Sequence, residues 1–101
     1  MPADAAPPPR PLSATWHSDT RTIDILFDRQ LAAGPLATAN WTVNYLLGYA
    51  NPTSAVAAAD TVTLATRSDQ KPTTVDYAPT QEPRLRGNDG TPAPAFSITV
   101  Q

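Results

Sequence analysis

The chain has one histidine and no cysteine, which limits the chemistry that its side chains can do. His17 falls on the outward face of a predicted strand, and one imidazole cannot complete a multi-histidine metal site. A catalytic triad would need a serine such as Ser13 or Ser18 beside this histidine. The sequence contains none of the motifs G-x-x-x-x-G-K-[ST], G-x-G-x-x-G, H-E-x-x-H and G-x-S-x-G. We therefore expect no catalytic, cofactor-binding or metal-binding residue, and no enzyme activity.

Four aspartates, Asp19, Asp24, Asp28 and Asp89, are the residues that could suggest calcium, which takes several oxygen ligands. Their spacing does not match the calcium loop D-x-[DN]-x-[DN]-G. The run Asn88-Asp89-Gly90 predicts a turn instead, because these residue types tolerate left-handed backbone conformations.

The aromatic residues raise the possibility of a carbohydrate-binding platform. Most of them fall on the inward phase of predicted strands, where core residues are expected: Trp16, Trp41, Tyr45, Tyr77 and Phe96. Tyr49, just after Gly48, is the one ring expected to be exposed. Exposed apolar groups usually act as a cluster, so carbohydrate binding is only an alternative interpretation.

Two arginines near the end of the chain could bind a partner. Arg84 and Arg86 flank Leu85 in an extended, proline-rich segment, and guanidinium groups can bind a carboxylate in a bidentate manner. We name Arg84, Leu85 and Arg86 as candidate partner-binding residues, with solvated loop charges as the ordinary interpretation.

The length and composition of the chain predict one domain with little charge. The chain has 101 residues, 16% of them charged, and a net charge of −2. Nucleic acid is an unfavourable partner because no basic surface is available for the phosphates. No apolar run approaches the roughly 20 residues that span a bilayer, so we expect no membrane insertion. Residues 1–11 lack the apolar segment of a secretory signal.

Residues 1–11 contain five prolines and predict an extended arm outside the fold. The arm is either a linker or a segment that docks on a neighbouring subunit, since a stiff segment loses little entropy on binding. Pro7, Pro8, Pro9 and Arg10 are its candidate partner-binding residues.

Residues 12–101 predict an all-β domain, because apolar residues alternate with polar ones in several short runs. The stretch 40–47 is the most prominent, with Trp41, Val43, Tyr45 and Leu47 on the inward phase. The first strand places Leu12, Ala14 and Trp16 in one phase. The other inward positions are Ile23, Ile25, Phe27, Val62, Leu64, Val75, Tyr77, Phe96, Ile98 and Val100. We expect loops at 28–39, with one helical turn, and at 81–94, and an irregular or short edge strand in 49–59.

The order of these runs resembles the cysteine-free immunoglobulin-like modules of bacteria and phages (Big/SwmB type). The runs that carry it are 22–28, 40–43, 61–64, 74–77 and 87–100, with an aromatic residue following Asn40 and a glycine turn before the last strand. The resemblance implies an immunoglobulin-like Greek-key β-sandwich of about seven strands. Such modules are scaffolds or attachment domains without a common catalytic residue.

We therefore expect a non-enzymatic structural and interaction module. With Met1 directly before the arm, we expect a free-standing chain at the virion surface, such as a phage capsid decoration or cement protein. Its partner would be a capsid or other structural protein, or a second copy of the chain. The alternatives are a repeat of a secreted adhesin, extracellular or on the bacterial cell surface, and an accessory carbohydrate-binding domain in which Tyr49 contacts the sugar.

Overall fold

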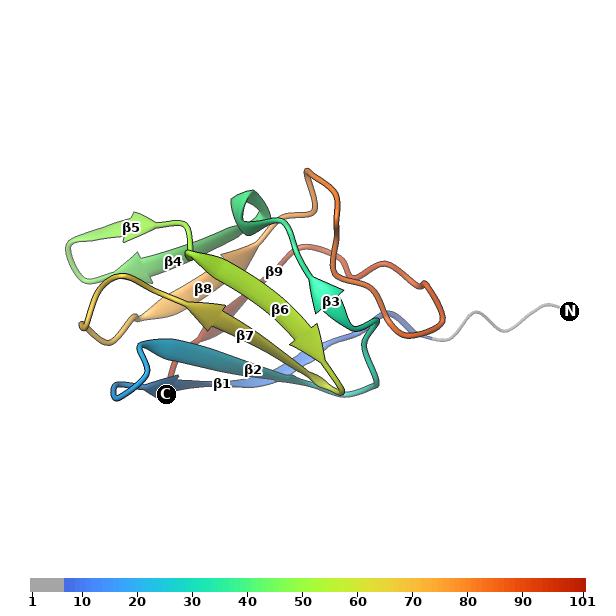
Figure 1. The fold of residues 1–101 in the computed structure, drawn as a ribbon, viewed down its shortest axis with the longest axis horizontal. Helices are drawn as coiled ribbons and strands as arrows, with labels where there is room; N and C mark the ends of the chain where they lie inside the picture. Colours follow the sequence, from blue (N-terminus) through green and yellow to red (C-terminus); the bar gives the residue numbers. More distant parts are fainter. Residues whose placement is uncertain (1–6) are drawn as a thin grey trace, which may run out of the picture.

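The computed structural model describes residues 7–101, and these residues form two antiparallel β-sheets (Figure 1). The first sheet has the order β1-β2-β7-β6-β3, and the second has the order β5-β4-β8-β9. A single turn of 3-10 helix, Thr38–Asn40, is the helical element of this part of the chain. The prediction of an all-β domain is confirmed, and the helical turn begins within the loop where it was expected and ends one residue beyond it.

The strands are short. The first sheet consists of β1 (Pro11–His17), β2 (Thr22–Phe27), β3 (Gly34–Pro35), β6 (Ser54–Ala58) and β7 (Thr61–Ala65). The second sheet consists of β4 (Trp41–Tyr45), β5 (Gly48–Ala50), β8 (Thr74–Tyr77) and β9 (Phe96–Thr99). The described residues thus contain nine strands where about seven were expected, because two very short edge strands, β3 and β5, were not predicted separately.

The core lies between the two sheets and follows the predicted alternation. The side chains of Ile23 and Ile25 from β2, Val62 from β7 and Val75 from β8 are fully buried. Trp41 and Tyr77 lie on neighbouring strands of the second sheet with their ring centroids 4.6 Å apart. Phe96 packs on both Tyr77 and Phe27, so the aromatic residues connect the two sheets.

Two predicted core positions are wrong. Leu12 is 59% exposed, because the register between β1 and β2 shifts between Pro11 and Ser13 and interrupts the phase of the strand. Leu47 is 96% exposed, because β4 ends at Tyr45 and Leu47 lies in the turn to β5. Trp16 and Tyr45 are partly buried and pack against the core.

The proline-rich arm was predicted to lie outside the fold, which is wrong for its last three residues. Pro9 is fully buried, and Pro11 is the first residue of β1. The backbone N–H of Arg10 donates to Asp28 Oδ1 at 2.9 Å, and the N–H of Asp28 donates to the carbonyl of Arg10 at 3.0 Å. The rest of the prediction falls largely on residues 1–6, which lie outside the described residues.

The ends of the domain also pair. Ala14 and Val100 form an isolated parallel bridge, in which the N–H of Gln101 donates to the carbonyl of Ala14 at 2.8 Å. This bridge joins the first strand of one sheet to the segment that follows the last strand of the other. Within residues 7–101, no helix is long and apolar enough to cross a membrane.

Candidate protein-binding surface

The predicted partner-binding residues lie at two different ends of the molecule. Tyr49 is in β5, at the end where Figure 1 draws the β4–β5 turn. The segment from Pro7 to Arg10 and the long loop before β9 lie at the other end (Figure 1). The structure therefore brings the arm and the Arg84–Arg86 region to one end, and separates both from Tyr49.

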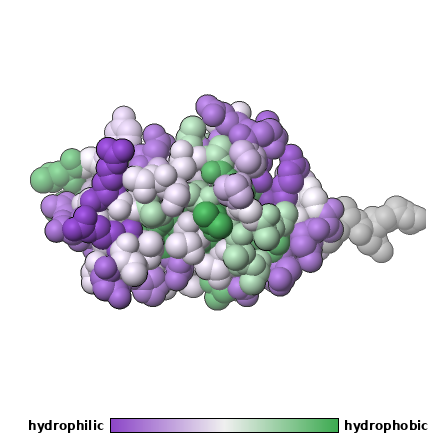
Figure 2. Space-filling model, in the orientation of Figure 1, coloured by the Kyte–Doolittle hydropathy of each residue, from purple (hydrophilic) through white to green (hydrophobic). Residues whose placement is uncertain are grey.

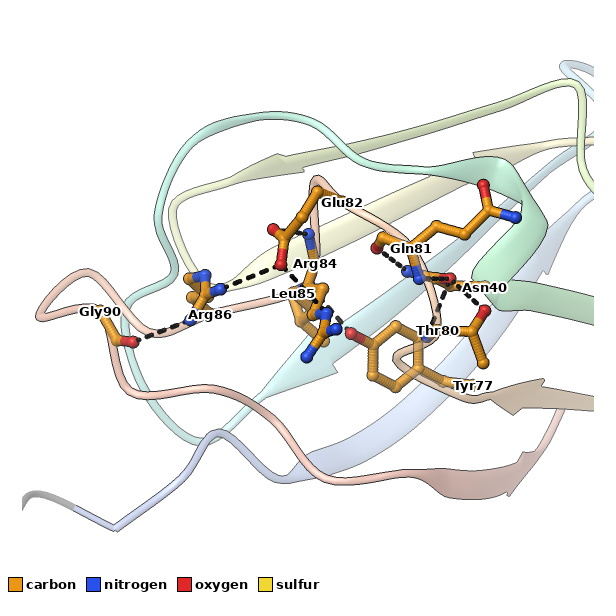
Figure 3. Close-up of polar contacts among 9 residues, drawn as sticks. All are labelled: Asn40, Tyr77, Thr80, Gln81, Glu82, Arg84, Leu85, Arg86 and Gly90. Carbon is orange, nitrogen blue, oxygen red and sulfur yellow. Dashed lines mark hydrogen bonds and ion pairs between the residues drawn. The ribbon is translucent and has the colours of Figure 1, made fainter.

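The loop from Pro79 to Pro94 is held to the sandwich by buried polar groups (Figure 3). The N–H of Leu85 donates to the hydroxyl of Tyr77 at 2.9 Å. The Asn40 side chain donates to the carbonyl of Gln81 at 2.7 Å and accepts from the N–H and hydroxyl of Thr80. Burial raises the pKa of the Tyr77 phenol, so it stays protonated while it accepts this bond.

Leu85 was predicted to contact a partner, and its position in the structure contradicts this. The side chain is fully buried and belongs to the hydrophobic core. It is therefore a structural residue that fixes the loop, and it offers no surface to another protein.

The two arginines beside it are paired within the loop (Figure 3). Glu82 Oε2 lies 3.0 Å from Arg84 Nε and 3.4 Å from Arg86 Nη2. Arg86 also donates to the carbonyl of Gly90 at 3.5 Å. One carboxylate thus faces both guanidinium groups, which weakens the prediction that they bind a partner's carboxylate.

Arg29 joins the arm to this loop, and the sequence did not single it out. Its guanidinium group lies 2.8 Å from Asp89 Oδ1 and donates to the carbonyl of Pro7. It also lies against Gly87, where an added Cβ atom would be 2.8 Å from the guanidinium carbon. The N–H of Thr91 and the Arg29 side chain lower the pKa of Asp89 to about 2. The turn predicted at Asn88-Asp89-Gly90 is present, with Gly90 at a φ of +90°.

The β4–β5 turn is the most exposed apolar feature of the described residues. Leu46 is 87% exposed and Leu47 is 96% exposed, and Tyr49 in the following strand is 78% exposed. Figure 2 shows apolar groups at this end of the molecule. Tyr49 was predicted to be exposed, which is confirmed, whereas the two leucines were not identified.

This turn departs from ordinary turn chemistry. Turn positions usually take Gly, Asn, Asp, Ser or Pro, whose backbones and polar side chains suit a tight reversal in water. Here only Gly48, at a φ of +151°, has that character. Two leucines at the tip bury almost none of their surface, so they contribute little to the stability of the fold. Residues that break a local rule without a structural gain are candidates for function.

The open side of β5 is equally unprotected. β5 pairs with β4 alone, and all three of its residues are exposed. Natural edge strands usually carry charges, proline or bulges that prevent pairing with another chain. Pro35 in β3 has this role at the edge of the first sheet, whereas Gly48, Tyr49 and Ala50 contain no such residue.

These features belong to a long segment without charge. All sixteen charged side chains of the protein, seven basic and nine acidic, lie outside residues 30–59. This segment contains β3, β4, β5 and β6, and therefore one edge strand of each sheet. We call its exposed part, comprising the Leu46–Leu47 turn, β5 and the outer residues of β6, the charge-free side. The run of thirty uncharged residues is the sequence signal that could have identified it.

The remaining candidates from the sequence are surface groups on the two sheets. His17 Nε2 lies 2.9 Å from Asp24 Oδ2, and the hydroxyl of Thr63 donates to the other oxygen of Asp24. Both the His17 and Asp24 side chains are 42% exposed, as expected for an outward face. Within residues 7–101, no three His, Cys, Asp or Glu side chains lie close enough together to hold a metal ion.

The outer face of the second sheet carries a row of polar groups. Asp76 accepts from the hydroxyl of Ser97 and from the amide of Asn44, and these hydrogen bonds, Ser97 first, lower the pKa of its carboxyl group. Tyr49 is paired with Asn44 across β4 and β5 and so points to the same face. The polar groups largely satisfy one another.

Comparison of the chain with protein-family models, with curated proteins and with solved structures gave no match.

Proposed function

We propose that the two sheets form an immunoglobulin-like Greek-key sandwich. The orders β1-β2-β7-β6 and β5-β4-β8-β9 correspond to the immunoglobulin orders A-B-E-D and C′-C-F-G. The tryptophan expected on strand C is Trp41 on β4, and Tyr77 on β8, the counterpart of strand F, packs against it together with Phe96 on β9, whereas antibody domains have a disulfide between strands B and F. One feature differs: Tyr77 ends its strand, so it is not the tyrosine corner, which lies near the start of strand F.

We further propose that the protein is a non-enzymatic structural and interaction module that docks through its charge-free side. The observation that carries this proposal is the exposure of Leu46, Leu47 and Tyr49 on a turn and an edge strand without charge. Protein interfaces are depleted of charge at their centre and enriched in aromatic residues. The partner that fits is a protein with an unpaired strand edge and an uncharged, apolar surface beside it.

Other partners fit this surface less well. Nucleic acid requires basic groups opposite its phosphates, and residues 30–59 contain none. Carbohydrate binding is supported by Tyr49 alone, since the other exposed large apolar side chains of the described residues are aliphatic. Titration of a polysaccharide panel with the wild type and Tyr49→Ala would reveal such an activity.

The test compares two ends of the same molecule. A photoreactive residue replaces Leu47 in one variant and Arg86 in another, and each is expressed at native level in the organism that encodes the chain. We expect one protein to cross-link from position 47 and not from position 86. The same cross-link from a photoreactive residue at Tyr49 should disappear when Leu46→Ser and Leu47→Ser are added.

The matched control is Leu12→Ser with Leu26→Ser, because both leucines are exposed on the first sheet, away from the turn. This control should keep the cross-link from position 49. Equal cross-linking from positions 47 and 86, or a cross-link that survives loss of both turn leucines, would refute docking through the charge-free side.

The setting of this interaction stays a prediction. The resemblance is compatible with both a phage virion surface and a bacterial surface protein, and we favour the first. The neighbouring genes distinguish the two settings: capsid genes beside the reading frame support the first, and a giant surface protein around it supports the second.

A further inference from the structure

We infer that the partner of the charge-free side is a second copy of this chain, paired antiparallel along β5 about a two-fold axis at Tyr49. This inference rests on the proposed function, because it names the partner of the same surface. It starts from the direction of the backbone groups of β5.

The free backbone groups of β5 belong to Tyr49. The residue opposite Tyr49 on β4 is Asn44, and the carbonyl of Asn44 accepts from the N–H of Thr73 at 2.8 Å, on the β8 side. Residues of an antiparallel strand direct their N–H and C=O groups to one neighbour and then to the other in alternation. Asn44 and Tyr49 are therefore a pair without mutual hydrogen bonds, and the N–H and C=O of Tyr49 point away from β4.

A second β5 satisfies these two groups. If Tyr49 faces its own copy across a two-fold axis, the two residues exchange both N–H···O bonds as a hydrogen-bonded antiparallel pair. Gly48 then faces Ala50 of the copy, and these small residues leave room for the approach of the strands. The two four-stranded sheets become one continuous sheet through the paired β5 strands.

The turn leucines gain a partner in this arrangement. Leu47 precedes Tyr49 by two residues, so it lies diagonal to Tyr49 of the copy, within the reach of long and aromatic side chains. Side chains that are 96% and 78% exposed in one copy would then cover each other.

The absence of charge favours a second copy over a different protein. A two-fold interface places each side chain near the axis next to its own copy, so any charge there meets a like charge. The whole chain carries a net charge of −2, yet residues 30–59 contain no charged side chain. This distribution removes self-repulsion where β5 strands would meet, and it provides no charge for recognising an oppositely charged partner.

The experiment places a charged side chain at position 49, on the proposed two-fold axis. Wild type and the variants Tyr49→Lys and Tyr49→Glu are studied by sedimentation velocity over a wide range of concentration. We expect the wild type to shift from a monomer of 10.7 kDa toward a dimer as concentration rises. Each variant alone should dimerise about tenfold more weakly or not at all, because like charges meet, and the equimolar mixture should regain the dimer.

Controls separate folding from association. Circular dichroism and thermal unfolding should show that both variants stay folded, since the Tyr49 side chain is exposed. Leu12→Lys, at a 59% exposed site on β1, should dimerise like the wild type.

Several results would overturn the inference: a wild type that stays monomeric at every concentration, Tyr49 variants that dimerise alone, or a mixture that stays monomeric. A monomeric wild type that still cross-links a different protein from position 47 would leave the proposed function standing. A dimer without any cross-link in cells would leave the dimer and refute the proposed function.

Discussion

At the scale of single residues, Leu85 and Asn40 fix the longest loop of the domain. Leu85 fills part of the core and donates its N–H to Tyr77, while Asn40, only 3% exposed, bonds to both Thr80 and Gln81. If these hydrogen bonds were lost, buried polar groups would be left without a partner, which costs about 1–3 kcal/mol for each group. The neighbouring arginines make contacts that water can replace.

This difference predicts the outcome of truncating Leu85 and Arg84. Leu85→Ala should lower the free energy of unfolding by about 2–5 kcal/mol, as expected for loss of a buried leucine. Arg84→Ala, the adjacent control, should lower it by about 1 kcal/mol or less, because its pair with Glu82 is partly exposed. Urea denaturation followed by tryptophan fluorescence measures both. Equal losses for the two variants would mean that Leu85 is not a core residue.

At the scale of elements, Arg29 connects two segments that are far apart in the sequence, the arm and the loop before β9. It contacts Pro7 in the arm, Gly87 in the long loop and Asp89 in the turn that follows. The arm is thus attached to the body of the domain at its last residues, and the pair with Asp89 depends on the ionised carboxylate.

The pKa of Asp89 predicts a pH dependence. It is about 2 in the folded protein against 3.8 for an ordinary aspartate, so the folded state favours the ionised form. This stabilisation is complete above pH 3.8 and is lost as the pH falls toward 2. In Asp89→Asn it is absent throughout.

Thermal unfolding of wild type and Asp89→Asn between pH 2 and 7 tests this dependence. The wild type should have the higher Tm near neutral pH, and the difference should shrink between pH 4 and pH 2. Asp69→Asn, in the loop between β7 and β8, controls for the loss of one negative charge. A difference in Tm that stays constant across this range would contradict the role of the Asp89 carboxylate.

The strands show how far the sequence predicts the fold. Alternation identified the inward side chains of β2, β4, β7 and β8, because within a regular strand the phase depends only on residue number. It failed at Leu12, where a register shift changes the phase, and at Leu47, where the strand has already ended. It could not place Leu85, which is held by the hydrogen bond from its N–H to the Tyr77 hydroxyl and by contacts within the core.

The candidate surface was predicted only at Tyr49. The other predicted residues lie at the opposite end, and two of them, Pro9 and Leu85, are buried. Composition over a long segment, rather than any motif, carried the missing information: thirty consecutive residues without charge include an edge strand of each sheet. Strand periodicity does not determine the sheet order, so it could not show that this segment supplies an edge strand to each sheet.

At the scale of the whole molecule, the exposed apolar turn belongs to a segment without charge, although the β7–β8 loop at the same end carries Arg67, Asp69 and Lys71 (Figure 1). The arginines, the acidic residues and the ion pairs of Arg29 and Glu82 lie outside residues 30–59. The charge-free side combines an apolar turn with an unprotected edge strand. The charged side chains belong to the rest of the chain, and docking through the charge-free side is what we propose.

The most direct test of this account is a concentration series of two-dimensional amide NMR spectra, from low micromolar to near millimolar protein. We expect shifts or line broadening at residues 46–51, with little change at Arg10, Arg84 and Arg86. Because the surface carries no charge, added salt should not abolish the shifts. Shifts confined to the arm and the Pro79–Pro94 loop, with residues 46–51 unchanged, would contradict the claim that the charge-free side is the protein-binding surface.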